Sequence, residues 1–286
     1  MIPAAFAYQR VATIDEALAI IGSDPGAKVL AGGQSLIPLL KLRLGSVDML
    51  VDIGRVPGLR GVRQLDDGRL AIGALTTYAE LLESPAKEYG VIRDALPHIG
   101  DVQVRNLGTI GGAIVHADPA QDLPACLLAL DAELVIRSAS GERTTPIDGF
   151  FEGAFMTGLE PGEILTEIRL PGPRDDAGSA YATLQQPASG YALTGVAAVV
   201  FSNGSGGIAG ANVALTGVGE MPYRARAVEA ALASSDGSTD SIAAAASHAT
   251  DGVDVSTDIH ADREYRTAMA AIYTRRAIEA ALARLR

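Results

Sequence analysis

The chain has 286 residues, of which 48% are hydrophobic and 5% aromatic, and its formal net charge is −11. This length and composition predict a folded protein of two or three domains rather than a disordered chain. The acidic balance argues against nucleic acid and against an anionic membrane surface as general partners, because both require a basic face on the protein.

The first region, residues 1–55, predicts a small β/α unit. Thr13 is a candidate helix N-cap, and Glu16 follows at the capping-box position before an apolar run that reaches Ile21. A short strand at residues 28–30 leads into a glycine turn at Gly32-Gly33. A short helix is expected at residues 38–44 and a second strand at 49–52.

The second region, residues 56–173, alternates between the patterns typical of strands and of helices. A second glycine turn is predicted at Gly111-Gly112, and the stretch from Pro171 to Gly178, rich in Pro, Gly and Asp, is the best candidate for a linker. The expected strands are 70–73, 132–137 and 164–170, and the expected helices are 77–82, with Thr77 as N-cap, 90–99 and 123–130.

The third region, residues 178–286, has strands followed by helices, a pattern that predicts an α+β domain. Strands are expected at 180–186, 193–201 and 208–215, with a hairpin connection at 202–207. In the last helix, the apolar residues at helical spacing are predicted to face the sheet: Tyr265, Met269, Ile272 and Tyr273.

The sequence has no pattern typical of a membrane protein or of a metal site. Its longest strongly apolar run, residues 192–201, is too short to span a bilayer, and the N-terminus lacks the features of a signal peptide. A cytoplasmic protein is therefore expected. Cys126 is the only cysteine and the four histidines are widely spaced, so neither a zinc site nor a cysteine-ligated cluster can be built within this chain.

Two glycine-containing segments are candidates for binding phosphate. They are LAGGQSL, which begins at Leu30, and NLGTIGGA, which begins at Asn106. Glycine allows backbone N–H groups to approach an anion, and a nearby Ser or Thr adds a hydroxyl donor. Neither segment fits the Rossmann fingerprint or the P-loop pattern. Each could equally be a simple turn, so the spacing alone gives only a weak hypothesis of a pyrophosphate site.

The order of four segments adds a second argument. AGGQSLIPLLKLRL begins at Ala31, RNLGTIGGAIVHADPAQDLPACLLALDA at Arg105, GEILTEIRLP at Gly162 and DIHADREYRTAMAAIYTRRAIEAAL at Asp258. In this order they resemble the FAD-binding medium subunits of the molybdenum hydroxylases, the family of carbon monoxide dehydrogenase and xanthine dehydrogenase. The resemblance covers essentially the whole chain.

The resemblance implies a fold and a set of domains. The expected fold class is α+β, with a PCMH/VAO-type FAD-binding domain made of two α/β subdomains and a C-terminal α+β domain of antiparallel sheet plus helices. The boundaries that follow are residues 1–55 and 56–173 for the two FAD-binding subdomains. Residues 178–286 form the C-terminal domain of the carbon monoxide dehydrogenase flavoprotein type.

The resemblance also implies which residues contact FAD, and it implies no catalytic side chain and no metal ligand. The first loop contributes Leu30, Ala31, Gly32, Gly33, Gln34, Ser35, Leu36 and Ile37, and the second Thr109, Ile110, Gly111, Gly112 and Ala113. The other positions are Ile99, Asp122, Leu165 and Tyr191. Asp122 could instead cap a helix, Ile99 and Leu165 could be core, and Tyr191 could either gate the flavin or be structural. Gln34 and Ala113 depart from the residues frequent in the family.

The implied function is electron transfer within a larger assembly. Such relatives work with a small iron–sulfur subunit and a large molybdopterin subunit, commonly as a dimer of heterotrimers, and the [2Fe–2S] clusters and the molybdenum cofactor lie on those partners. Electrons would leave FAD for a quinone, NAD or oxygen, and the complex would be cytoplasmic or peripheral to the inner membrane.

The carbon monoxide dehydrogenase branch is the most similar, so carbon monoxide is the first expected substrate. An aromatic or N-heterocycle dehydrogenase of the nicotine or isoquinoline type, or a xanthine-type dehydrogenase, is the alternative. A non-catalytic nucleotide-binding or assembly protein and a stand-alone flavin oxidase are alternatives of other classes.

Overall fold

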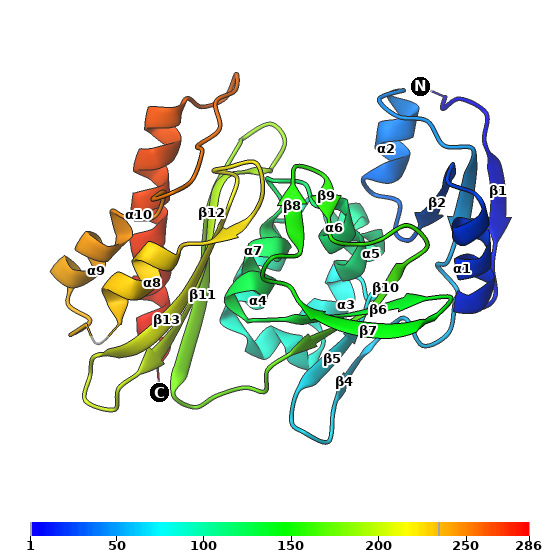
Figure 1. Cartoon of the computed structure of the whole chain (residues 1–286). Helices are drawn as coiled ribbons and strands as arrows, with labels where there is room; N and C mark the ends of the chain where they lie inside the picture. The colour runs from blue at the N-terminus through cyan, green and yellow to red at the C-terminus, as the bar shows by residue number, and fades with distance from the viewer. Residues whose placement is uncertain (1, 234, 286) are drawn as a thin grey trace.

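The computed structural model describes residues 2–233 and 235–285. Its N-terminal part is a parallel three-stranded sheet in the order β1-β3-β2, with α1 beside it (Figure 1). The predicted cap of α1 is confirmed, because the Glu16 N–H donates to Thr13 Oγ1 at 3.2 Å and the Ala12 N–H donates to Glu16 Oε2 at 2.8 Å. The elements are β1 (Ala7–Arg10), α1 (Ile14–Ser23), β2 (Ala27–Leu30), α2 (Leu36–Lys41) and β3 (Met49–Asp52).

The middle part is built on an antiparallel five-stranded sheet in the order β4-β5-β10-β6-β7. The N-cap predicted at Thr77 is confirmed, and it forms a capping box in which the Thr77 N–H donates to Glu80 Oε2 at 2.9 Å. The strands are β4 (Val62–Gln64), β5 (Leu70–Gly73), β6 (Glu133–Ser138), β7 (Gly141–Pro146) and β10 (Ile164–Leu170), with a small pair β8 (Phe151–Gly153) and β9 (Met156–Thr157). The helices are α3 (Tyr78–Leu82), η1 (Pro85–Glu88), α4 (Gly90–Ala95), η2 (Leu96–His98), α5 (Val102–Leu107), α6 (Ile110–His116) and α7 (Asp122–Ala129).

The C-terminal part is an antiparallel sheet in the order β11-β12-β13-β14, with helices on its outer face (Figure 1). The strands are β11 (Ala177–Gln185), β12 (Ala192–Ser202), β13 (Ile208–Thr216) and β14 (Tyr223–Arg224). The helices are α8 (Arg226–Leu232), α9 (Thr239–Ala246) and α10 (Arg263–Leu282). The α+β class and the C-terminal antiparallel sheet with helices are as expected from the sequence.

Both faces of the C-terminal sheet are buried, which explains the continuous apolar run in β12. Ala197 and Val199 belong to the core that includes α4 and α7, whereas Val196, Ala198 and Val200 belong to the core that includes α8, α9 and α10. Successive side chains of a strand point to opposite faces, so a strand that is covered on both sides loses the alternation of apolar and polar residues. The sheet is therefore the layer through which the C-terminal helices and the middle part are joined.

The predicted buried stripe of α10 is wrong. Tyr265 is 45% exposed, and Met269, Ile272 and Tyr273 are only partly buried. The buried face consists mainly of small residues, and includes Ala270, Ala277 and Ala281. A Cβ atom on Gly178 of β11 would lie 2.0 Å from the Ala281 carbonyl oxygen. The helix backbone thus approaches the strand so closely that large side chains cannot fit between them.

The predicted turn at Gly111-Gly112 is also wrong, because both residues lie inside α6. The short helix expected at 38–44 begins two residues earlier and ends at Lys41. Among the residues in the two described ranges, no helix is both long and apolar enough to cross a lipid bilayer.

Candidate functional site

A cavity of about 190 Å³ brings together residues from all three parts of the chain. Its walls come from the start of α2, the segment after η2, the helices α3, α5, α6 and α7, and the loop before β12. Six of the residues predicted to contact FAD line it: Gln34, Ser35, Ile99, Ala113, Asp122 and Tyr191. The other lining residues are Tyr78, Gly100, Val104, Gln121, Leu123, Ser189 and Gly190.

The first glycine loop is held against the second segment by contacts that only glycine permits. A Cβ atom on Gly32 would lie 1.9 Å from the Leu107 carbonyl oxygen, and Gly33 has φ = +71°. Within the described part of the chain, the backbone N–H groups of residues 32–35 have no acceptor. The loop therefore presents a row of open donors beside the cavity, which is the arrangement that binds an anion.

The second segment differs, because its N–H groups are already bonded inside the protein. Ile110 donates to the Thr76 carbonyl at 3.0 Å, and Gly111 donates to the Ala74 carbonyl at 2.9 Å. Gly112 donates to Thr109 Oγ1 at 3.2 Å, which caps α6. The glycines serve close packing instead, since a Cβ atom on Gly111 would lie 2.5 Å from that of Ala74. Open donors thus come from the first loop.

Asp122 is the buried acidic group of the cavity wall, with an exposure of 5%. The suggestion that it caps α7 is wrong: it is the first residue of that helix, and Gln121 occupies the N-cap position without a side-chain hydrogen bond. The Tyr181 hydroxyl donates to Asp122 Oδ1 at 2.6 Å. Burial raises the pKa of Asp122 from its ordinary 3.8 to about 6, because an apolar surrounding disfavours the charged carboxylate.

The raised pKa of Asp122 leads to a prediction for Asp122→Asn in the FAD-free chain. Because the folded state binds the proton more tightly, stability falls as pH rises from about 4 to 6, and above this window the charged form costs about 3 kcal/mol. Asn is uncharged, so the stability of the variant relative to wild type should increase by about 2 kcal/mol between pH 4.5 and pH 7.5. Urea unfolding of both proteins at the two pH values measures this. A constant difference would contradict the shifted pKa.

Several predicted residues do not line the cavity. Leu165 is 3% exposed and packs in the main core, and Ile110 and Gly111 are buried residues of α6. In the first loop, the cavity is lined by Gln34 and Ser35, and Leu30 packs beneath the glycine turn near Gly33. The contact of these residues with a cofactor stays a prediction.

The sequence patterns did not identify two further residues at the wall of this cavity, Arg105 and Gln121. The Arg105 guanidinium donates to the carbonyls of Ile99 and Gly100 at 3.1 and 3.0 Å, and so holds that wall segment in place. Gln121 lines the cavity, and within the described residues its buried Oε1 accepts no hydrogen bond. No sequence signal identifies either role, because both depend on how separate segments meet.

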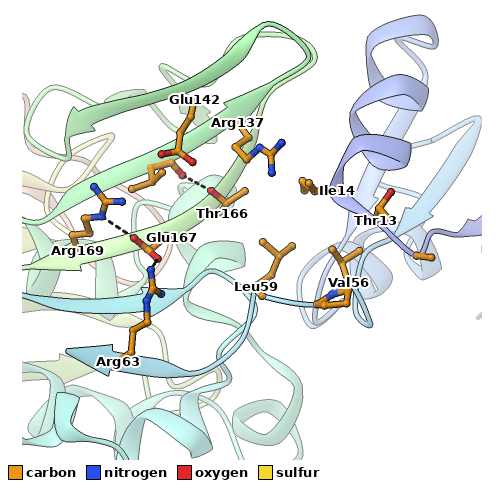
Figure 2. A pocket seen from close by; sticks show the side chains of 14 residues that line it. Thr13, Ile14, Val56, Leu59, Arg63, Arg137, Glu142, Thr166, Glu167 and Arg169 are labelled. Atoms are coloured by element: carbon orange, nitrogen blue, oxygen red, sulfur yellow. Dashed lines mark hydrogen bonds and ion pairs between the residues drawn. The ribbon is translucent and has the colours of Figure 1, made fainter. Parts of the chain in front are cut away.

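A larger cavity of about 450 Å³ contains none of the predicted residues. It lies between Thr13–Ile14, the segment 56–59 and the face of the five-stranded sheet (Figure 2). Figure 2 shows Glu167 between two guanidinium groups, with Arg63 at 2.5 Å and Arg169 at 2.7 Å. The smaller cavity is the better candidate for the functional site, because six of the predicted residues line it and none line the larger one.

Comparison with known proteins assigns both parts of the chain to families. The family described as the FAD binding domain in molybdopterin dehydrogenase matches residues 4–173, and the CO dehydrogenase flavoprotein C-terminal domain matches residues 179–281. The chain is 38% identical to the carbon monoxide dehydrogenase medium chain of Hydrogenophaga pseudoflava, over 99% of both chains. It is 36% identical to the 6-hydroxypseudooxynicotine dehydrogenase complex subunit alpha of Paenarthrobacter nicotinovorans, over 100% of this chain and 97% of the relative.

Among solved structures, the fold matches a carbon monoxide dehydrogenase from Hydrogenophaga pseudoflava that lacks the Mo-pyranopterin moiety of the molybdenum cofactor. The TM-score is 0.95 and the identity is 40%, over 99% of both chains. A quinoline 2-oxidoreductase from Pseudomonas putida 86 matches with a TM-score of 0.93 at 31% identity, covering 100% of this chain and 99% of that one.

Proposed function

This chain belongs to the FAD-binding medium subunits of the molybdopterin dehydrogenases, and from that membership we propose that it binds one FAD along the first glycine loop, with part of the cofactor in the adjoining 190 Å³ cavity. In the proposed function, electrons reach this FAD from iron–sulfur clusters on a partner subunit and leave to an external acceptor such as a quinone. The flavin supplies the redox chemistry, and the protein binds and orients it.

The observation that carries the proposal is the row of open N–H groups at residues 32–35 beside a cavity lined by Asp122 and Tyr191. A dinucleotide has an anionic diphosphate, which suits backbone donors, and a ring system with both donors and acceptors. The free acceptor Gln121 Oε1 and the aromatic rings of Tyr78 and Tyr191 supply the complementary groups. The polar and aromatic groups of the cavity therefore fit FAD.

Partner subunits follow from what this chain lacks. Cys126 is its only cysteine and is fully buried, so the cysteine ligands of [2Fe–2S] clusters must come from another chain. We place the clusters on a small iron–sulfur subunit and the molybdenum cofactor on a large subunit, in a dimer of heterotrimers.

Carbon monoxide is the proposed substrate of the complex, and a nicotine-type N-heterocycle is the second candidate. The support is the similarity to the carbon monoxide dehydrogenase medium chain at 38% identity, against 36% for the pseudooxynicotine relative. The difference in identity is small because, in the proposed complex, the large subunit selects the substrate and this medium subunit does not.

The test is native purification of the chain with any bound partners, followed by cofactor release and quantification. We expect one FAD per chain, together with iron and molybdenum that co-purify in two further subunits. The flavin absorbance should bleach under anaerobic conditions on addition of carbon monoxide, with nicotine and xanthine tested in parallel. A chain that carries no FAD and binds none when it is supplied would overturn the proposed function, and bleaching by nicotine alone would overturn only the substrate.

A further inference from the structure

A buried side-chain hydrogen bond links an acidic residue of the cavity wall to the C-terminal sheet. Asp122 begins α7 in the middle part, and Tyr181 lies on β11, 59 residues further along the chain. Tyr181 Oη donates to Asp122 Oδ1 at 2.6 Å, and the contact is buried, because Tyr181 is 7% exposed. The cavity that takes the ligand therefore depends on a strand outside the family's FAD-binding domain.

Tyr181 is held in place from three directions. Its backbone N–H donates to Asp94 Oδ2 on α4 at 3.1 Å, and the Arg284 guanidinium near the end of the chain donates to the same carboxylate at 2.5 Å. Beneath its hydroxyl lies Gly195 of β12, where a Cβ atom would come within 2.0 Å of Tyr181 Oη. The phenol thus has one position, which glycine at 195 makes possible.

The charged and titratable groups around Asp122 leave Tyr181 as its only side-chain donor within the described residues. Cys126 lies on the same helix and is buried. Burial, together with the nearby charges of Asp122 and of Asp94 on α4, raises the pKa of its thiol. Tyr78 of α3 and Tyr191 of the loop before β12 face Asp122 across the cavity without bonding to it. Removing the Tyr181 hydroxyl would therefore leave the carboxyl without a fixed partner.

We infer that Tyr181 is a positioning residue for the cofactor: its hydroxyl fixes the Asp122 carboxyl in the cavity wall and so sets how FAD binding responds to pH. The inference rests on the proposed function, because it assumes that FAD occupies the cavity that Asp122 lines. Tyr181 itself does not line the cavity, so its effect on FAD passes through Asp122.

The experiment measures the dissociation constant of FAD for the FAD-free full chain from pH 5 to pH 8, by the change of flavin fluorescence on binding. The variants are Tyr181→Phe, which keeps the ring and loses the hydroxyl, and Asp122→Asn, which removes the titrating group. Tyr223→Phe is the matched control, because the hydroxyl of the partly buried Tyr223 donates to the Ala249 carbonyl at 2.9 Å, away from the cavity. Circular dichroism verifies that each variant is folded.

In wild type and in Tyr223→Phe, the plot of log Kd against pH should change slope near the pKa of Asp122, about 6. The hydrogen bond from Tyr181 stabilises the carboxylate, so in Tyr181→Phe the change of slope should move upward by about one pH unit, with FAD binding weakened about tenfold. In Asp122→Asn the change of slope should disappear.

Three results would count against these ideas in different ways. An unchanged pH profile in Tyr181→Phe, with FAD still bound by wild type, would overturn the positioning role alone. An equal shift in Tyr223→Phe would assign the effect to general loosening of the C-terminal part, which also overturns it. Failure of wild type to bind FAD at any pH would overturn the proposed function itself.

Discussion

Replacement of Gly32 by alanine is expected to abolish retention of FAD and to destabilise the chain by about 3 kcal/mol or more. The added methyl group would lie 1.9 Å from the Leu107 carbonyl oxygen and 3.1 Å from the Gly108 Cα, so it meets backbone rather than a side chain that can rotate away. The first loop would have to move away from the segment before α6, and the open N–H groups of residues 32–35 would be displaced from their place beside the cavity. FAD content after purification and the thermal unfolding temperature measure the two effects.

Gly22 provides the control for this substitution. It lies on the exposed side of α1, and a Cβ atom there would have no neighbour within 4 Å. Gly22→Ala should therefore retain FAD fully and be neutral or stabilising by about 0.5–1 kcal/mol, because alanine is the better helix former. If Gly32→Ala behaved like Gly22→Ala, the close approach of the two segments would have no role in holding the cofactor.

Local sequence signals predicted those elements whose ends are set by nearby residues. The caps at Thr13 and Thr77 are formed with partners three residues away, and β3, β5 and β10 have the predicted bounds. Edge strands such as β1 and β4 were not predicted, because their short and largely exposed sequences have little apolar alternation. Such strands form only because a neighbouring strand supplies the hydrogen bonds.

The errors occurred where packing between distant segments decides the outcome. Gly111 and Gly112 have the composition of a turn, yet they are helical because α6 must lie directly on Ala74. The large side chains of α10 were predicted to be buried, yet the close approach at Gly178 selects alanines.

In the candidate site too, the sequence did not predict contacts that depend on packing between distant segments. The resemblance placed Gln34, Asp122 and Tyr191 near the cofactor, and the structure brings them to one cavity. Tyr181 and Arg105 act through carboxyl and carbonyl groups that only the fold brings near them.

Substitution of Arg224 by methionine is expected to destabilise the chain by about 3 kcal/mol, because it leaves the Leu128 carbonyl without this donor and the nearly buried Glu229 with only the exposed Arg226 as a cation. The Arg224 side chain is 4% exposed and bonds to Glu229 and Asp131, each at 2.5 Å. It also donates to Asn212 Oδ1 at 2.7 Å and to the Leu128 carbonyl in α7 at 3.2 Å. This one guanidinium thus ties β13 and α8 to the helix that begins with Asp122, so FAD affinity should fall together with stability.

Arg226→Met is the matched control, because Arg226 pairs with the same Glu229 at 3.0 Å but its side chain is 60% exposed. Water screens that pair, so its loss should cost about 1 kcal/mol or less. Thermal unfolding of the two variants beside wild type compares a buried with an exposed arginine on the same carboxylate. Equal losses would mean that the Arg224 network contributes no more to the joining of the C-terminal sheet and α7 than a surface ion pair does.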